Sequence, residues 1–315
     1  MNGKVSIGTR GSALALWQSN WVKSALEKQF SHLSFALKVI KTKGDRILDV
    51  PLAKVGGKGL FVKEIEDALL DGRIDLAVHS MKDMPAEIPP GLAIGAIPRR
   101  ENPQDVLLSK NGLSLSNLAA GARIGTGSLR RAAQLRYARK DLDVVPLRGN
   151  LDTRIRKLTT EDLDGIILAA AGVRRLGFES KITQYLDENI MLPAAGQGAL
   201  CIEVRQNDPR ITPVVGVLNH LETQAAVLGE RAFLNRIGGS CQVPVAAYGK
   251  IQKEILVLCA LVADIDGKTI IKETASGSTL HSVDIGTKLA DRLLARGAKE
   301  LLEKIGLTEH ETTKR

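Results

Sequence analysis

The sequence predicts an α/β protein with two α/β lobes and a small C-terminal α+β domain. Short apolar runs alternate with amphipathic helical patterns through most of the chain, which is typical of largely parallel sheets. Two segments, 98–103 and 193–198, interrupt this alternation with proline or glycine and indicate crossings between lobes. Beyond about residue 219, strands joined by tight turns precede a long helix, which indicates a separate α+β domain.

The first lobe is expected to begin with a strand over 5–7, a turn over 8–12 and a helix over 13–28. Ser12 precedes this helix and is a natural N-cap. Helical spacing predicts that its buried face contains Leu14, Trp17, Trp21, Val22 and Ala25. A second helix follows 56–59 and ends at Asp71-Gly72, and a buried strand follows over 74–78.

The second lobe is expected to contain strands over 123–125, 144–146 and 165–170, and a helix over 129–140. The C-terminal domain should hold a helix over 223–236, strands over 243–249, 255–264 and 269–275, and a terminal helix over 284–305. The predicted boundaries are 1–98 for lobe 1, completed by 197–218, then 99–196 for lobe 2 and 219–315 for the C-terminal domain.

Composition excludes several classes of protein. The net charge of +9 suggests an anionic partner. Aromatic residues are only 3% of the chain and no zinc-finger spacing occurs, which argues against nucleic acid. The longest apolar run, Ile255–Ala263, is too short to cross a membrane, and the N-terminal segment lacks the apolar core of a secretion signal. We therefore expect a cytoplasmic protein that binds neither membrane nor nucleic acid. We also expect a monomer, although composition does not determine the oligomeric state.

Three turns share one layout, in which glycines and a basic residue stand at the start of a helix: 8–12, 56–60 and 125–131. Helix N-termini attract anions, and ligands of α/β sheets bind at the carboxyl ends of the strands. Twelve Lys/Arg against six Asp/Glu lie between Arg123 and Arg175, and arginine binds carboxylates through two parallel hydrogen bonds. None of the turns matches a nucleotide-binding motif, so the pattern favours a ligand with several carboxylates.

The segment His79–Pro85 follows an apolar strand and should emerge at the same edge. We expect His79 to be structural, because no partner stands at metal-ligand spacing, and we expect no metal. Asp83 is either a surface partner of Lys82 or a catalytic carboxylate. Cys201 and Cys259 lie in apolar strands and are expected in the core. Cys241 lies in a glycine-containing loop and is either a reactive thiol or a passive residue.

Six segments in order carry a resemblance to a known family: GTRGSALALWQ, KGLFVKEIEDALLDGRIDLAVHSMKDMP, GTGSLRRAAQL, LRGNLDTRIRKL, LPAAGQGAL and ERAFLNRIGGSCQVPVAAY. From about residue 5 to the C-terminal helix, the chain closely resembles the porphobilinogen deaminase family. The resemblance implies a transferase of porphyrin and heme biosynthesis that acts as a hydroxymethylbilane synthase. It implies stepwise deaminating condensation of four porphobilinogen molecules onto a covalent dipyrromethane primer, followed by hydrolytic release of the linear tetrapyrrole.

The resemblance also implies residue roles and a fold. Cys241 would carry the dipyrromethane cofactor through a thioether, and Asp83 would be the catalytic carboxylate. The lobes would be similar to type-II periplasmic binding proteins. The positions that match cofactor-binding or substrate-binding residues of the family are Arg10, Ser12, Lys82, Thr126, Ser128, Arg130, Arg131, Arg148, Arg154, Arg175 and Gln197.

Two positions depart from the family pattern: Gly127, where many relatives have serine, and Ser240, where glycine is frequent. Neither departure affects Asp83 or Cys241. The alternative function is a two-lobed receptor or sensor that binds carboxylates without catalysis, because such a protein would share the fold.

Overall fold

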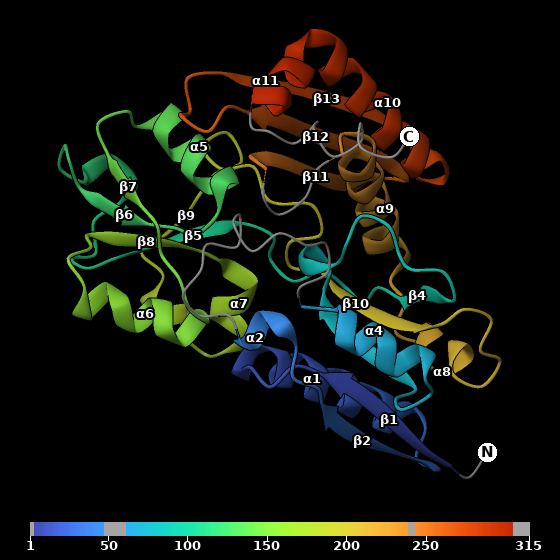
Figure 1. Ribbon diagram of the computed structural model, residues 1–315. Coiled ribbons are helices and arrows are strands. Elements are labelled where there is room, and N and C mark those ends of the chain that lie inside the picture. The colour runs from blue at the N-terminus through green and yellow to red at the C-terminus, as the bar shows by residue number, and fades with distance from the viewer. Residues whose placement is uncertain (1–2, 47–60, 239–242, 305–315) are drawn as a thin grey trace, which may run out of the picture. The chain divides into compact units, whose positions relative to one another are not determined.

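The structure is a computed structural model that describes residues 3–46, 61–238 and 243–304 (Figure 1). Contacts within the chain divide it into two compact units. Unit 1 contains 1–103, 171–178 and 196–224, and unit 2 contains 104–170, 179–195 and 225–315. The three-domain boundaries stay a prediction. None of the helices in the described part of the chain has the length and apolar character needed to cross a membrane.

The strands are β1 Gly3–Thr9, β2 Leu33–Val39, β3 Leu76–Ser80, β4 Leu92–Ala96, β5 Asp105–Ser109, β6 Arg123–Gly125, β7 Asp143–Val145, β8 Gly165–Ala169, β9 Gln184–Tyr185, β10 Leu200–Arg205, β11 Val245–Gln252, β12 Ile255–Ala263 and β13 Ile270–Ser278. The helices are α1 Ala13–Gln29, α2 Lys43–Arg46, α4 Lys63–Leu70, α5 Leu129–Ala138, α6 Leu151–Thr160, α7 Ala170–Arg175, α8 Thr212–Gly216, α9 Leu221–Arg236, α10 Ser282–Leu293 and α11 Lys299–Lys304. Short 3₁₀ turns span Met81–Asp83, Leu115–Asn117, Glu179–Lys181 and Thr279–His281.

Unit 1 contains a five-stranded sheet in the order β2-β1-β3-β10-β4. β1 pairs in parallel with β2 and β3, whereas β10 runs antiparallel to both of its neighbours. The α1 side of the sheet is packed by Val22 and Leu26, and the α4 side by Ile65 and Leu69. Successive residues of β3 point to opposite faces, so each face of this strand is covered by one of the two helices.

The predicted apolar face of α1 is partly wrong. Val22 is buried as expected, but Trp17 is 37% exposed and Trp21 is 40% exposed. The buried positions of the helix are Ala15, Gln18, Ser19, Val22 and Leu26. This stripe is rotated from the expected one because it includes polar side chains, which the apolar pattern ignores; Gln18, for example, donates through Nε2 to the Ser80 hydroxyl at 2.9 Å. Ser12 caps the helix as predicted and accepts a hydrogen bond from the Ala15 backbone N–H at 3.3 Å.

Unit 2 contains a second five-stranded sheet in the order β7-β6-β8-β5-β9. Strands β6, β7 and β8 are parallel, with β7 at the edge of the sheet, and β5 is antiparallel to β8 and β9. Both five-stranded sheets therefore combine parallel strands with one antiparallel strand, which is β10 in unit 1 and β5 in unit 2. Leu135 of α5 and Leu107 of β5 belong to the core on one side of this second sheet.

A three-stranded antiparallel sheet, β11-β12-β13, completes unit 2. One face is covered by Phe233 of α9 and Leu289 of α10, and the other packs against Ala133 of α5. The single terminal helix expected over 284–305 is wrong. The chain kinks over Leu294–Ala298, where Gly297 has a φ of +99°, and continues as α11. The predicted class of two α/β lobes with a small α+β domain is confirmed.

Candidate active site

One edge of the unit 1 sheet gathers several of the predicted site residues. Arg10 and Ser12 follow the carboxyl end of β1, and Asp83 follows the carboxyl end of β3. The antiparallel strand β10 starts at the same edge, because Leu200 pairs with Ser80, so Gln197 lies just before it. This is the edge at which α/β sheets bind their ligands.

Asp83 is the last residue of the 3₁₀ turn Met81–Asp83. The Met81 backbone N–H donates to the Ala199 carbonyl at 3.0 Å, and the Met84 N–H donates to the Met81 carbonyl at 3.2 Å. Met81 and Met84 are both buried, whereas Asp83 between them is half-buried. Within the described part of the chain, no hydrogen bond or ion pair engages the Asp83 carboxylate. The turn thus presents this carboxylate on a fixed backbone.

Two glycines allow the 196–198 segment to approach this turn. Gly196 has a φ of +71°, and a Cβ atom there would lie 2.5 Å from the Met81 Cγ. Gly198 has a φ of +87°, and its Cβ atom would lie 2.4 Å from the Glu101 carbonyl oxygen. Both positions require glycine on conformational and steric grounds.

Gln197 is fully buried and connects three segments of unit 1. Its Nε2 donates to the Pro103 carbonyl at 2.7 Å, and its backbone carbonyl accepts from Arg100 Nε at 2.7 Å. Lys82 Nζ donates to the Gln197 Oε1 at 3.5 Å. Gln197, which was matched by family resemblance, therefore lies beside Lys82 and joins the 98–103 and 193–198 segments.

Arg10 is already paired within unit 1. Its guanidinium donates to the Asp45 carboxylate and lies over the Phe61 ring, 4.2 Å from the centroid. Burial alone would raise the pKa of Asp45, but hydrogen bonds from Arg10 and Thr42 outweigh it and hold the pKa below its ordinary value. One edge of the Arg10 guanidinium is therefore engaged by Asp45, and one face is covered by Phe61.

Arg175 has a different environment. Its Nη2 donates to the Gly198 carbonyl at 2.8 Å, and its guanidinium carbon lies 5.8 Å from the centroid of the Trp17 ring. Burial lowers the pKa of Arg175 to about 10, although the charge of Glu101 raises it. No carboxylate forms an ion pair with Arg175 among the residues the structure describes.

His79 lies within β3 and not after it, because β3 extends to Ser80 through its pairing with β10. The expectation that the His79 side chain emerges at the sheet edge is wrong, whereas its structural role is supported. Its Nε2 lies 3.1 Å from the Glu203 carboxylate, and both groups are buried. Glu66 of α4 is buried nearby and has a pKa raised to about 7 by burial and by the charge of Glu203.

In unit 2, the corresponding sheet edge carries other predicted residues. Thr126 and Ser128 follow β6, and the Thr126 hydroxyl accepts from the Ser128 N–H at 3.3 Å. The Ser128 side chain makes no capping hydrogen bond to α5. At Gly127 a Cβ atom would lie 2.6 Å from the Leu147 carbonyl oxygen, so the turn as it stands has no room for serine.

Arg148 and Arg154 frame the loop between β7 and α6. Arg148 is half-buried, and Arg154 Nε donates to the Gly149 carbonyl at 2.8 Å. Asn150 caps α6 by accepting from the Thr153 N–H at 2.9 Å. This cap fixes the start of the helix that carries Arg154.

Arg130 and Arg131 are buried and share Asp105, the first residue of β5. Arg130 donates through both Nη atoms to the Asp105 carboxylate at 2.7 and 3.2 Å, and Arg131 Nε donates at 2.9 Å. Arg130 Nη1 also donates to the Leu192 carbonyl, and Arg131 Nη1 donates to the Ile167 carbonyl. These contacts give both arginines a structural role, and a binding role for them stays a prediction. Asp105 was not identified from the sequence. An acidic residue at the first position of an apolar strand could have indicated a buried ion-pair partner for an arginine.

The predicted cofactor-attachment residue Cys241 lies outside the described residues, as do 56–60. Cys201 is buried in β10 as expected, while Cys259 of β12 is only half-buried. Of the predicted site residues that the structure describes, Arg10, Ser12, Lys82, Asp83, Arg175 and Gln197 belong to unit 1, and Thr126, Ser128, Arg130, Arg131, Arg148 and Arg154 belong to unit 2.

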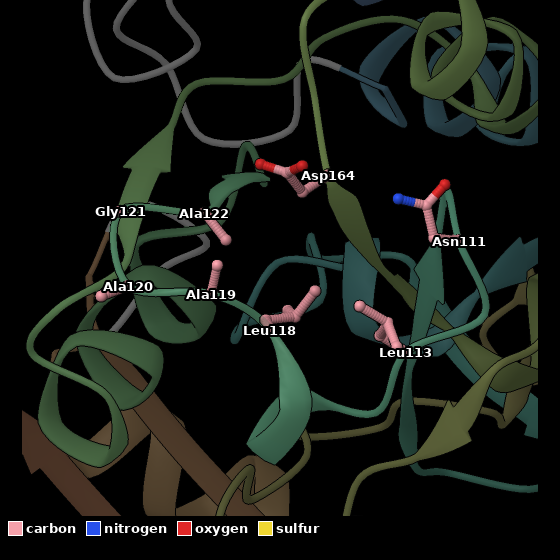
Figure 2. Close-up of a pocket in the computed structure, with 8 residues that line it drawn as sticks. All are labelled: Asn111, Leu113, Leu118, Ala119, Ala120, Gly121, Ala122 and Asp164. Carbon is pink, nitrogen blue, oxygen red and sulfur yellow. The ribbon is translucent and has the colours of Figure 1, made fainter.

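A pocket of about 280 Å³ lies in unit 2 (Figure 2). It is lined mainly by the 118–122 segment, with Asn111 and Asp164 as its polar groups. These segments precede β6 and β8, so the pocket lies at the amino ends of the parallel strands. The predicted binding turns follow the carboxyl ends, and the pocket is therefore separate from them.

Solved structures with a similar chain path include a TRAP periplasmic solute binding protein from Desulfovibrio salexigens, with a TM-score of 0.44 and 11% identity over 70% of this chain and 73% of that one. The methionine binding protein MetQ matches with a TM-score of 0.43 and 12% identity, over 68% of this chain and 89% of its own. Likenesses at this level say nothing about activity.

The sequence comparisons are far stronger. The family model for porphobilinogen deaminase, dipyromethane cofactor binding domain, matches residues 5–213, and that for the C-terminal domain matches 224–295. Proteins named porphobilinogen deaminase from Syntrophotalea carbinolica and Pelobacter propionicus are each 53% identical over 302 residues. Both matches cover 96% of this chain, and they cover 96% and 97% of the respective relatives. The chain belongs to the porphobilinogen deaminase family.

Proposed function

We propose that this chain is a hydroxymethylbilane synthase. It joins four porphobilinogen molecules head to tail onto a covalently bound dipyrromethane primer and releases the linear tetrapyrrole by hydrolysis. The observation that carries the proposal is the 53% identity to curated porphobilinogen deaminases along nearly the whole length of both chains. Porphobilinogen is the substrate of this family, and the family uses a dipyrromethane cofactor.

The donor set fits a cofactor with several carboxylates. Each pyrrole ring bears an acetate and a propionate, so a chain of six rings carries twelve carboxylates. Arg175 has no carboxylate partner among the described residues, and the Ser128 hydroxyl is not used in capping α5. Arg148, Arg154 and Ser128 of unit 2 would hold cofactor carboxylates, with Cys241 supplying the thioether. When bound, the cofactor supplies the nucleophilic pyrrole carbon that starts the chain.

Asp83 is the proposed catalytic residue. In each cycle, the C–N bond of the protonated aminomethyl group of porphobilinogen breaks, neutral ammonia leaves, and the ring that remains carries the positive charge. A C–C bond then forms to the free α-carbon of the preceding ring, which loses its proton. The Asp83 carboxylate stabilises the cation as it develops and can accept the released proton at its Oδ atoms. The arginines and Lys82 keep the growing polyanion in place.

The stoichiometry of turnover tests this function. Purified protein given porphobilinogen should release one ammonia per substrate consumed and one linear tetrapyrrole per four substrates. Ehrlich's reagent should also colour the purified protein through its bound dipyrromethane. A colourless protein that binds porphobilinogen without releasing ammonia would instead be a carboxylate-binding receptor. The cytoplasmic location and monomeric state are further proposals from the sequence, which cell fractionation and light scattering would test.

A further inference from the structure

Trp17 lies outside the buried stripe of α1. The helix buries Ala15, Gln18 and Val22 against the sheet, whereas the Trp17 side chain is 37% exposed. Packing against the core of unit 1 therefore does not account for this large ring. The position one turn further on holds Trp21, which is 40% exposed and provides an internal comparison.

The Trp17 ring lies against the guanidinium of Arg175. The Arg175 Cζ is 5.8 Å from the ring centroid, within the range at which a cation and an aromatic face attract each other. Arg175 also donates through Nη2 to the Gly198 carbonyl at 2.8 Å. A ring and a carbonyl thus hold the guanidinium from two directions.

Arg175 differs from three other predicted binding arginines, Arg10, Arg130 and Arg131, in having no carboxylate partner among the described residues. Arg10 is engaged by Asp45, and Arg130 and Arg131 by Asp105. A guanidinium has five N–H donors, and within the described part of the chain Arg175 uses one of its nitrogens, for Gly198. The charge of Glu101 raises the pKa of Arg175, but the Glu101 carboxylate forms its ion pair with Arg174, at 2.8 Å. Arg175 is therefore a partly buried cation with donors left for an anion.

We propose that Trp17 is a positioning residue that orients Arg175 to bind an acetate or propionate carboxylate of the pyrrole chain. This inference rests on the proposed function. The aromatic face restrains the plane of the guanidinium, so that its remaining N–H groups keep one direction. Without the ring, Arg175 would retain its charge but would sample other rotamers, and carboxylate binding would weaken.

Three single variants, and Trp17→Leu repeated in an Arg175→Gln background, separate this role from a structural one. Trp17→Leu should raise the KM for porphobilinogen by about three- to tenfold with kcat within about twofold of wild type, because only carboxylate binding is weakened. Trp17→Phe retains an aromatic face and should restore most of the KM. Trp21→Leu, the matched control one helical turn away, should leave both constants unchanged. In an Arg175→Gln background, Trp17→Leu should have no further effect on KM.

A spectroscopic measurement gives a readout independent of turnover. The chain has two tryptophans, Trp17 and Trp21, so Trp21→Phe leaves Trp17 as the sole indole. In an Asp83→Asn background, porphobilinogen should then change the Trp17 fluorescence in a saturable way, and adding Arg175→Gln should abolish that change. The complementary Trp17→Phe protein, which retains Trp21, should respond much less.

The possible outcomes are distinguishable. If wild type consumes porphobilinogen but Trp17→Leu has the same KM as Trp21→Leu, the inference about Trp17 is wrong and the proposed function stands. If Trp17→Leu raises KM equally with and without Arg175, Trp17 does not act through Arg175, and the inference is also wrong. If wild type releases no ammonia from porphobilinogen, the proposed function itself fails.

Discussion

The His79 imidazole Nε2 lies 3.1 Å from a carboxylate oxygen of Glu203, and this contact joins β3 to β10 inside unit 1. The two side chains lie on the face of the sheet that α4 covers. His79 stands at the end of the strand that leads into the Asp83 turn. The contact therefore stabilises the strand pair from which the proposed catalytic turn projects.

Replacing His79 with leucine should destabilise the protein, because the buried Glu203 carboxylate would lose its hydrogen-bond partner. We expect the unfolding free energy to fall by about 3 kcal/mol. Glu203→Gln keeps a polar partner for His79 and should cost about 1 kcal/mol. Urea unfolding measures both values. A His79→Leu protein as stable as wild type would show that this contact contributes nothing.

Glu66 should make stability depend on pH. Its pKa is about 7, against an ordinary 4.5, because burial and the charge of Glu203 raise it more than His79 lowers it. Between these values the folded chain holds a proton that the unfolded chain has lost. The stabilisation is complete below about pH 4.5 and is lost as the pH rises through about 7. The shift of this pKa from 4.5 to about 7 corresponds to about 3 kcal/mol of unfolding free energy.

Urea titrations of wild type and Glu66→Gln between pH 4.5 and 8 test this dependence. The variant should lose much less stability over that window than wild type. Asp67→Asn is the matched control: Asp67 is an exposed carboxylate on the same helix whose charge contributes least to raising the pKa of Glu66, so this variant should follow wild type closely. Parallel curves for wild type and Glu66→Gln would exclude Glu66 as the titrating group.

Asp105→Asn should be strongly destabilising, because two buried arginines would lose their only carboxylate among the described residues. We expect a loss of about 3–5 kcal/mol in unfolding free energy. Asp143→Asn serves as the control: it breaks an exposed pair with Arg123 and should cost less than about 1 kcal/mol. Equal costs for the two variants would mean that the buried arginines do not depend on Asp105.

Asp83→Asn should lower turnover by about 100- to 1,000-fold, as expected when a preorganised charge is removed from a developing cation. Its urea unfolding midpoint should match that of wild type, because Asp83 makes no hydrogen bond within the described part of the chain. Ammonia release and unfolding measured on the same preparation separate these effects. Near-normal turnover would remove Asp83 from the mechanism.

Local sequence signals predicted local structure well. The strand Arg123–Gly125 and the Ser12 cap agree with the structure, because they depend on a few adjacent residues. Long-range pairing was not predictable in the same way. β3 extends to Ser80 because β10, some 120 residues later, pairs with it, and no local pattern contains that information.

The environment of a side chain was likewise predictable only where it depends on residues nearby in the sequence. The arginine-rich turns were identified from sequence, but which guanidiniums are engaged internally depends on distant partners. Asp105 forms ion pairs with Arg130 and Arg131. Among the described residues, Arg175 contacts only the Trp17 ring and the Gly198 carbonyl. The α1 face was misjudged because hydrophobicity alone placed Trp17 in the core, whereas its ring faces Arg175.

The central claim is a growing chain that stays attached to the enzyme through Cys241. Intact mass spectrometry tests it directly. The measured mass of wild type should exceed the mass calculated from its sequence by one two-ring unit. Brief exposure to porphobilinogen should add up to four further rings in single steps. Cys241→Ser should have the mass of the bare chain. A wild-type protein that turns over porphobilinogen at its unmodified mass would contradict the claim.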